Sequence, residues 1–315
     1  MINFSDDFDA FRVAASNEIA RHLHELEPQF APAIGLPEER AYQAARYAFD
    51  AGGKRLRGIL IMCSSALADP NGQCSADAMT AAVSVELMHT YSLIHDDLPA
   101  MDDDALRRGK PTTHIAYDDA TAILAGDGLQ ALALQLLAQG LHQTDPVDAL
   151  ALVADLTQAV GFGGMVGGQM LDIIAETTST PFNLDTTKRL QAKKTGALIR
   201  YAAKAGAVMH GERGELLSQL ERYGARIGLA FQIVDDLLDL RGDSAVVGKA
   251  VGKDDDKATF IDLLGEQGAR DEVQRLTMDA LQITQFLQEQ ANIFAQQAAA
   301  QQLSNIAQFI ATRHH

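Results

Sequence analysis

The chain has 315 residues, of which 47% are hydrophobic, and its formal net charge is −16. This hydrophobic fraction is enough for a sizeable core and excludes wholesale disorder. The acidic balance argues against a nucleic-acid partner, because phosphate backbones are bound by clustered Lys and Arg. A small polyanion could be bound only where the few cations are concentrated or metal ions are recruited.

Cysteine usage and the first residues predict the compartment. Cys63 and Cys74 have no metal-ligand spacing, so we interpret them as reduced thiols. The stretch from Met1 to Asp7 has neither a basic region nor an apolar core, which argues against a signal peptide. No run approaches the ~20 apolar residues that span a bilayer. We therefore expect a soluble, cytoplasmic protein without stable membrane insertion.

Turn signals divide the chain into helix-length segments. They fall at residues 52–53, 69–72, 145–146, 179–181 and 241–243. The segments between them have roughly 15–30 residues, the length of long bundle helices. No low-complexity linker or shift in composition marks a domain boundary. We therefore predict one domain over residues 1–315.

Periodicity and proline placement predict the fold class. Apolar residues recur at helical spacing, for example Val83, Leu87 and Tyr91. All eight prolines lie between Pro28 and Pro181, so the last 134 residues can form long, uninterrupted helices. No stretch alternates strictly between apolar and polar residues, which makes a sheet improbable. The prediction is an all-α protein of about ten or more helices.

The first acidic cluster runs from Ile94 to Arg108. Asp96 and Asp102 are six residues apart, which on a continuous helix separates them by about 240° around the axis. They can converge only if the helix stops between them. Pro99 predicts that stop, because the residue before a proline disfavours helical angles. We expect the helix to end near Asp97 and the chain to return Asp102 towards Asp96.

The second acidic cluster has a different spacing. Asp235 and Asp239 are four residues apart, so a helix places both carboxylates on one face, about 40° apart. Gln232 lies one turn earlier on the same stripe.

Isolated acidic pairs are more often solvated helix faces than metal sites. Here both clusters are embedded in apolar residues, where like-charged carboxylates are costly without a compensating cation. Hard oxygen ligands suit Mg²⁺, which takes one or two carboxylates together with water and substrate phosphate oxygens. The pattern therefore favours two Mg²⁺-binding segments.

Basic residues occur in tight groups. These are Lys54-Arg55-Leu56-Arg57 after Gly52-Gly53, Arg107-Arg108-Gly109-Lys110, Lys193-Lys194-Thr195-Gly196, and Lys249, Lys253 and Lys257. Taken singly, each group is more often ordinary surface charge. Acidic and basic groups that alternate between Asp96 and Arg108 instead favour a site for metal and phosphate together. His89 alone is more often a surface or satisfied core histidine, but its place before Asp96 makes it a candidate phosphate donor.

These motifs, in this order, resemble the trans-prenyl (polyprenyl) diphosphate synthases, and most closely the bacterial farnesyl diphosphate synthases (geranyltranstransferases). The resemblance covers nearly the whole chain and is strongest from Gly52 to about Gly265. Its further markers are Leu124-Ala-Gly-Asp127, Gly168-Gln-Met-Leu-Asp172 and Phe231-Gln-Ile-Val-Asp-Asp-Leu-Leu-Asp239. It implies an isoprenoid-synthase-type helical bundle around a central deep cavity, usually as a homodimer.

The resemblance also implies the reaction and its residues. Isopentenyl diphosphate would condense with dimethylallyl and geranyl diphosphate to give (2E,6E)-farnesyl diphosphate. Mg²⁺, as three ions for which Mn²⁺ substitutes, would be bound by Asp96, Asp97, Asp102, Asp235, Asp236 and Asp239. Arg107, Lys194 and Lys249 would contact the allylic diphosphate, and isopentenyl diphosphate would contact Lys54, Arg57, His89 and Arg108. The remaining substrate-binding residues would be Thr195, Phe231, Gln232 and Lys257. The catalytic set would be Asp96, Asp102, Arg107, Lys194, Thr195, Gln232 and Asp235.

Two departures from the family pattern stand out. Gly58 follows Arg57 where the family usually has proline. The segment from Gly248 to Thr259 is shorter than usual and has no glycine before Lys257, so Lys257 is the contact that the resemblance supports least.

Product length should depend on what closes the cavity beyond the first motif. Tyr91 lies five residues before Asp96, about 7.5 Å along a helix. A bulky ring there, together with the two extra residues inside the first motif, resembles the farnesyl-producing pattern, and Ser92 is the second candidate chain-length residue. The alternative is that Tyr91 is only a core aromatic, which leaves a geranylgeranyl diphosphate synthase open. A terpene cyclase is less favoured because the second motif keeps its aspartates. A non-catalytic synthase subunit is disfavoured for the same reason, since both motifs are intact.

Overall fold

The protein is almost entirely helical in the computed structural model, which describes residues 4, 7–33, 35–177, 182–240 and 259–313. The elements of the first half are α1 (Phe8–Leu26), the 3₁₀ turn η1 (Glu27–Gln29), α2 (Glu39–Asp50), α3 (Leu56–Ala68), α4 (Ala76–Asp96), β1 (Leu106–Arg107), β2 (Lys110–Pro111), α5 (Thr113–Ala116) and α6 (Asp119–Gly140). Those of the second half are α7 (Pro146–Val160), α8 (Met165–Thr177), α9 (Leu184–Gln191), the π-helical turn η2 (Ala192–Gly196), α10 (Ala197–Val208), α11 (Glu215–Leu240), α13 (Phe260–Gln290) and α14 (Phe294–Thr312). The all-α prediction is confirmed.

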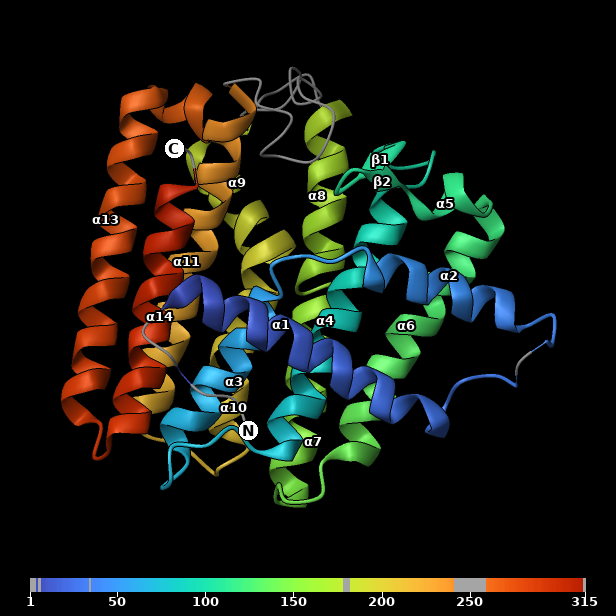
Figure 1. Ribbon diagram of the computed structural model, residues 1–315. Helices are drawn as coiled ribbons and strands as arrows, with labels where there is room; N and C mark the ends of the chain where they lie inside the picture. Colours follow the sequence, from blue (N-terminus) through green and yellow to red (C-terminus); the bar gives the residue numbers. More distant parts are fainter. Residues whose placement is uncertain (1–3, 5–6, 34, 178–181, 241–258, 314–315) are drawn as a thin grey trace.

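Three helices, α3, α4 and α10, form the centre of the bundle. Nearly every residue of α3 and α10 is buried, and α4 is buried along most of its length. Gly206 of α10 allows this packing, because a Cβ there would lie 2.2 Å from the carbonyl oxygen of Ile61 in α3. Helices α11, α13 and α14 stand beside this core, and α1 and α2 cross in front of it in Figure 1.

The proline-free last part forms the longest helices. Helix α11 has 26 residues and α13 has 31, the latter with a kink at Gly265, whose φ is 72°. Glycine adopts this left-handed angle without steric cost.

The expectation of no sheet was wrong in one detail. Leu106–Arg107 pairs antiparallel with Lys110–Pro111, and the two residues between them, Arg108 and Gly109, both have positive φ (54° and 75°). Such angles define a type I′ hairpin turn. Strands of two residues are too short to produce the alternation on which a sequence prediction depends.

Two helical stretches, Asp119–Gly140 and Pro146–Ala175, are long and apolar enough to cross a membrane by length and composition. In the most apolar window of each stretch, less than half is buried in the single chain, 44% and 33% respectively. Buried core helices of other proteins share this composition, so the finding is weak evidence for a membrane span.

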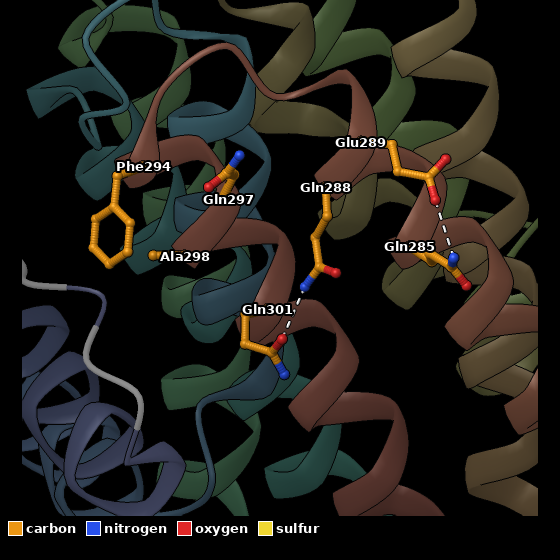
Figure 2. Close-up of a pocket in the computed structure, with 7 residues that line it drawn as sticks. All are labelled: Gln285, Gln288, Glu289, Phe294, Gln297, Ala298 and Gln301. Carbon is orange, nitrogen blue, oxygen red and sulfur yellow. Dashed lines mark hydrogen bonds between the residues drawn. The ribbon is translucent and has the colours of Figure 1, made fainter.

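A cavity of about 600 Å³ opens between α13 and α14 (Figure 2). Its lining is rich in glutamine. Gln288 of α13 is hydrogen-bonded to Gln301 of α14 (2.8 Å), and Gln285 is hydrogen-bonded to Glu289 within α13 (3.0 Å). None of the predicted site residues lines it. This cavity is therefore not the predicted central deep cavity, which stays a prediction.

Candidate active site

The first acidic motif has the geometry that its proline predicts. Helix α4 ends at Asp96, and Asp97 is its C-cap. The chain then turns back, so that the Asp102 N–H donates to the Asp96 carbonyl at 2.8 Å and the Asp104 N–H donates to the Asp97 carbonyl at 3.2 Å. These bonds fix the backbones of Asp96 and Asp102 against each other and confirm the predicted break.

Asp97 and Arg107 form a buried ion pair beside this turn. Arg107 Nε donates to Asp97 Oδ1 at 2.6 Å, and its Nη2 lies 3.6 Å from Asp104 Oδ2. Burial alone would lower the pKa of Arg107, but the hydrogen bond that it donates to Asp97 and the charges of Asp97 and Asp96 raise the pKa above its ordinary value. Asp97 thus holds the guanidinium at the motif, and the β1–β2 hairpin supplies the arginine.

Lys194 of the turn η2 also lies near the first motif. Its Nζ lies 2.5 Å from Asp172 Oδ2 of α8, and the charges of Asp96 and Asp102 also reach it. Burial opposes these charges, yet the pKa of Lys194 is raised, so it is an ammonium at neutral pH. Lys194 and Thr195 belong to the π-helical turn η2, and such turns occur frequently at functional sites.

Gly168 allows α8 to approach η2 closely. A Cβ at this position would lie 2.2 Å from the backbone nitrogen of Lys194. We expect Gly168→Ala to force α8 and η2 apart, at a cost of about 1–3 kcal/mol in folding free energy. Because Lys194 moves with η2, kcat should fall about tenfold or more.

Steady-state kinetics and thermal unfolding test this prediction. Gly214→Ala is the matched control, because a Cβ there meets nothing within 4 Å. Equal kcat values for the two variants would contradict the positioning role of Gly168.

The second acidic motif lies on the last turns of α11. Asp235 Oδ1 is 3.0 Å from Nη2 of Arg313, the residue that follows α14, and this guanidinium also stacks over the Phe231 ring at 4.3 Å. Asp236 Oδ2 accepts the N–H of Phe260 at 2.8 Å, so it caps the first turn of α13. Asp235 and Asp239 share one helical face as predicted, whereas Asp236 is held by the start of another helix.

A group of arginines surrounds His89 on α4. Burial, followed by the charges of Arg57 and Arg108, holds the pKa of His89 well below its ordinary value, so the imidazole is neutral at pH 7. Arg108 reaches this group by packing over the Gly52–Gly53 turn, where a Cβ on Gly53 would lie 2.7 Å from its guanidinium. The predicted isopentenyl-type residues His89, Arg57 and Arg108 are therefore brought together.

Lys54 lies beside this group and shares Arg108 with it as a neighbour. Burial lowers its pKa to about 8, and the neighbouring charges are those of Arg313, Asp235, Arg12 and Arg108, of which only Asp235 raises it. An ordinary lysine keeps its proton up to about pH 10, whereas Lys54 loses it as the pH rises through about 8.

A pH effect on substrate binding follows from this lowered pKa. If Lys54 binds a diphosphate, KM for that substrate should rise above about pH 8, because the ammonium is lost there, and should be flat below it. Lys54→Arg should remove the rise, since guanidinium keeps its charge. Steady-state KM from about pH 7 to pH 9.5 checks this. The same rise in both proteins would rule out Lys54 as its source.

The family model for polyprenyl synthetases matches residues 38–297. The chain belongs to the polyprenyl synthetase family. Over 294 residues it is 40% identical to the farnesyl diphosphate synthase of Escherichia coli, covering 92% of this chain and 94% of that one. It is also 40% identical to the geranylgeranyl diphosphate synthase of Cyanophora paradoxa, covering 76% and 79% respectively.

Solved structures of the family have the same fold. An apo FPP/GFPP synthase from Zymomonas mobilis is 39% identical, with a TM-score of 0.83 and coverage of 97% of this chain and 99% of that one. A geranyltransferase from Helicobacter pylori, complexed with magnesium and isoprenyl diphosphate, is 32% identical, with a TM-score of 0.79 and coverage of 94% and 95%. The isoprenoid-synthase-type fold that the motifs implied is confirmed.

The donor set suits the metal-dependent chemistry of this family. Within the residues that the structure describes, no group of three or more acidic, histidine or cysteine side chains converges on one metal-sized point. Mg²⁺ typically takes only one or two carboxylates and fills its shell with water and phosphate oxygens. Two separate carboxylate motifs therefore fit Mg²⁺ that is bound together with a diphosphate substrate.

Not every predicted residue is described. Lys249 and Lys257 lie outside the described residues. Tyr91 is buried below the first motif, with its ring 5.8 Å from that of His95 in an edge-on contact, and Ser92 donates its hydroxyl to the His89 carbonyl. Gln232 and Phe231 are half-buried on α11 near the second motif.

Sequence reasoning gave no site role to Arg55, Glu86, Asp172 or Arg313. Asp172 stood inside a quoted marker but received no assignment. Glu86 could have been identified from the sequence, because it is a carboxylate between the apolar residues Val85 and Leu87. Charged residues are seldom buried without a partner.

Proposed function

We propose that the chain is a farnesyl diphosphate synthase, which condenses isopentenyl diphosphate with dimethylallyl and geranyl diphosphate. The observation that carries this proposal is the presence of two cationic groups at one pair of aspartate motifs. Lys194 and Arg107 adjoin the first motif, while Arg57 and Arg108 surround His89 a short way along α4. A condensation of two diphosphates requires two such anion sites.

The first step is ionisation of the allylic carbon–oxygen bond. Lys194 and Arg107 stabilise the negative charge on the departing diphosphate. Three Mg²⁺ ions, for which Mn²⁺ would substitute, would be held by Asp96, Asp102, Asp235 and Asp239. When bound, they would act as Lewis acids and neutralise the same negative charge. Asp97 orients Arg107, and Asp236 supports the second motif by capping α13.

The second step is attack by the alkene of isopentenyl diphosphate on the allylic cation. Backbone carbonyls at Lys194 and Thr195, together with the Gln232 amide, direct dipoles at the positive carbon. Lys54, Arg57, His89 and Arg108 orient the incoming diphosphate. The proton that is then lost goes to the released diphosphate, so no protein base is required.

Incubation with radiolabelled isopentenyl diphosphate and each of the C5, C10 and C15 allylic diphosphates tests the function, with and without Mg²⁺. We expect C15 product from the C5 and C10 starters, only with metal. Turnover of the C15 starter to C20 would favour the geranylgeranyl alternative, which the similarity to the Cyanophora paradoxa enzyme keeps in view. No condensation with any starter would refute the enzyme.

We also propose a homodimer that covers the apolar side of α6, α7 and α8. Leu124, Val147, Leu150 and Phe162 on or beside these helices are 59–89% exposed in the single chain. Large exposed apolar side chains on successive helices are typical of a protein interface. Such cover would also account for the apolar composition of the two membrane-length stretches. We propose in addition that the protein is cytoplasmic and forms one domain.

Sedimentation equilibrium tests the dimer. The wild-type chain is expected to have twice the monomer mass at micromolar concentration, and Leu124→Glu should shift it to monomer, because a buried unpaired carboxylate is costly. Val13→Glu on α1 is the control, since Val13 is 51% exposed and outside this surface. A monomeric wild-type protein would refute the proposal.

A further inference from the structure

Glu86 is a buried carboxylate with no role in the reaction described so far. It lies on α4 three residues before His89, hence on the same helical face, and is 2% exposed. Its Oε1 accepts the N–H of Gly58 at 2.9 Å, and its Oε2 lies 3.6 Å from Nη1 of Arg55. Both contacts are at the start of α3, so this one side chain ties α4 to the first turn of α3.

The start of α3 needs such an external partner. The first N–H groups of a helix have no partner within it. The N-cap residue is Arg55, whose φ of 49° is uncommon for a residue other than glycine and whose side chain caps nothing in its own helix. Glu86 supplies the missing acceptor from another helix, and its negative charge also suits the positive end of the α3 dipole.

Arg55 is fixed by three contacts. Its guanidinium donates to the Phe49 carbonyl, stacks over the Phe49 ring at 3.9 Å and faces Glu86. Lys54 precedes it and Arg57 follows two residues later, so the direction of both depends on the turn at Arg55. Nε of Arg57 is buried and has no hydrogen-bond partner within the described part of the chain.

Residue 58 makes this arrangement particular to the present sequence. A proline there, as the resemblance leads one to expect, would have no N–H to give to Glu86. The space is closed as well, because a Cβ on Gly58 would lie 2.6 Å from Cδ1 of Ile19 and 3.3 Å from Cγ of Glu86. Gly58 therefore suits Glu86 in two ways. It donates its N–H to the carboxylate, and its lack of a side chain leaves room for Glu86.

We propose that Glu86 is a positioning residue for the isopentenyl diphosphate subsite: through Gly58 and Arg55 it fixes the turn that directs Lys54 and Arg57 at the diphosphate of that substrate. The inference rests on the proposed function. Glu86 touches neither substrate, and it acts on the homoallylic side alone, because its contacts are with α3 and not with Lys194 or Arg107.

Glu86→Gln tests the proposal, because the amide keeps an oxygen for the Gly58 N–H but loses the charge that holds Arg55. We expect KM for isopentenyl diphosphate to rise about tenfold, the loss of one charge-assisted interaction, while KM for geranyl diphosphate and kcat stay within about twofold. Asp77→Asn is the matched control. Asp77 is on the same helix, nine residues before Glu86, is equally buried at 2% exposure, and accepts the N–H groups of His142 and Thr144 in the loop between α6 and α7.

The control should lower Tm as Glu86→Gln does, yet leave both KM values unchanged. A wild-type KM for isopentenyl diphosphate in Glu86→Gln, or an equal rise in both KM values, would overturn the proposal. If this variant does not fold, Arg55→Lys replaces it, since lysine keeps the charge but not the planar fork, and a wild-type KM there is equally decisive. Absence of turnover in the wild-type chain would instead refute the proposed function.

Discussion

Asp102→Asn is expected to lower kcat/KM about a thousandfold, the scale on which loss of one preorganised charge at a transition state acts. The Asp102 backbone is locked to Asp96 by the 2.8 Å hydrogen bond, so the amide will occupy the place of the carboxylate without refolding the turn. The substitution removes only the negative charge, which acts on Lys194 and which we propose attracts the metal. Steady-state kinetics at saturating Mg²⁺ measures the loss, and Mn²⁺ binding followed by electron paramagnetic resonance should weaken in parallel.

Asp103→Asn is a close control for this substitution. Asp103 is the next residue, is exposed, and has a φ of 49°, a left-handed angle that asparagine tolerates well. Its kcat/KM should stay within about threefold of wild type. If the two variants lose activity equally, the turn as a whole matters and Asp102 has no special place as a metal ligand.

Tyr91→Ala is expected to change the product from C15 to C20 and longer. The Tyr91 ring is 5% exposed and lies on α4 more than one turn before Asp96, where it meets His95 edge-on. Removing the ring opens space below the first motif, into which a longer prenyl chain can extend. Chromatography of the dephosphorylated products from labelled isopentenyl diphosphate gives the chain lengths directly.

Two further variants isolate the ring as the cause. Tyr91→Phe keeps the ring and should give C15 alone, because the hydroxyl is not the barrier. Tyr201→Ala removes an equally buried tyrosine, 3% exposed, from α10, and should destabilise the protein by about 3–5 kcal/mol without lengthening the product. If Tyr91→Ala makes only C15, Tyr91 is a core aromatic with no role in chain length.

Features that depend on neighbouring residues could be predicted from the sequence. Pro99 was sufficient to predict where α4 ends and why Asp102 returns to Asp96, because both are consequences of local backbone geometry. The shared face of Asp235 and Asp239 followed in the same way from the helical repeat.

Pairings between distant segments could not be predicted in this way. Lys194 meets Asp172, Arg55 meets Glu86, and Asp235 meets Arg313 only because separate helices pack side by side. Residue types and spacing show that a charge is present but not which opposite charge faces it. The same limit applies to Asp236, which the resemblance implied as a metal ligand and whose Oδ2 accepts the N–H of Phe260.

The contact of Arg313 with Asp235 has a practical consequence for handling the protein. Arg313 comes directly after α14, yet its guanidinium is 3.0 Å from an aspartate of the second motif and over the ring of Phe231. Trimming α14 by a single turn, or fusing a tag close behind it, would therefore alter the charge next to that aspartate. Purification tags are better placed at the other end of the chain, and activities measured on carboxyl-terminal fusions should be compared with the untagged enzyme.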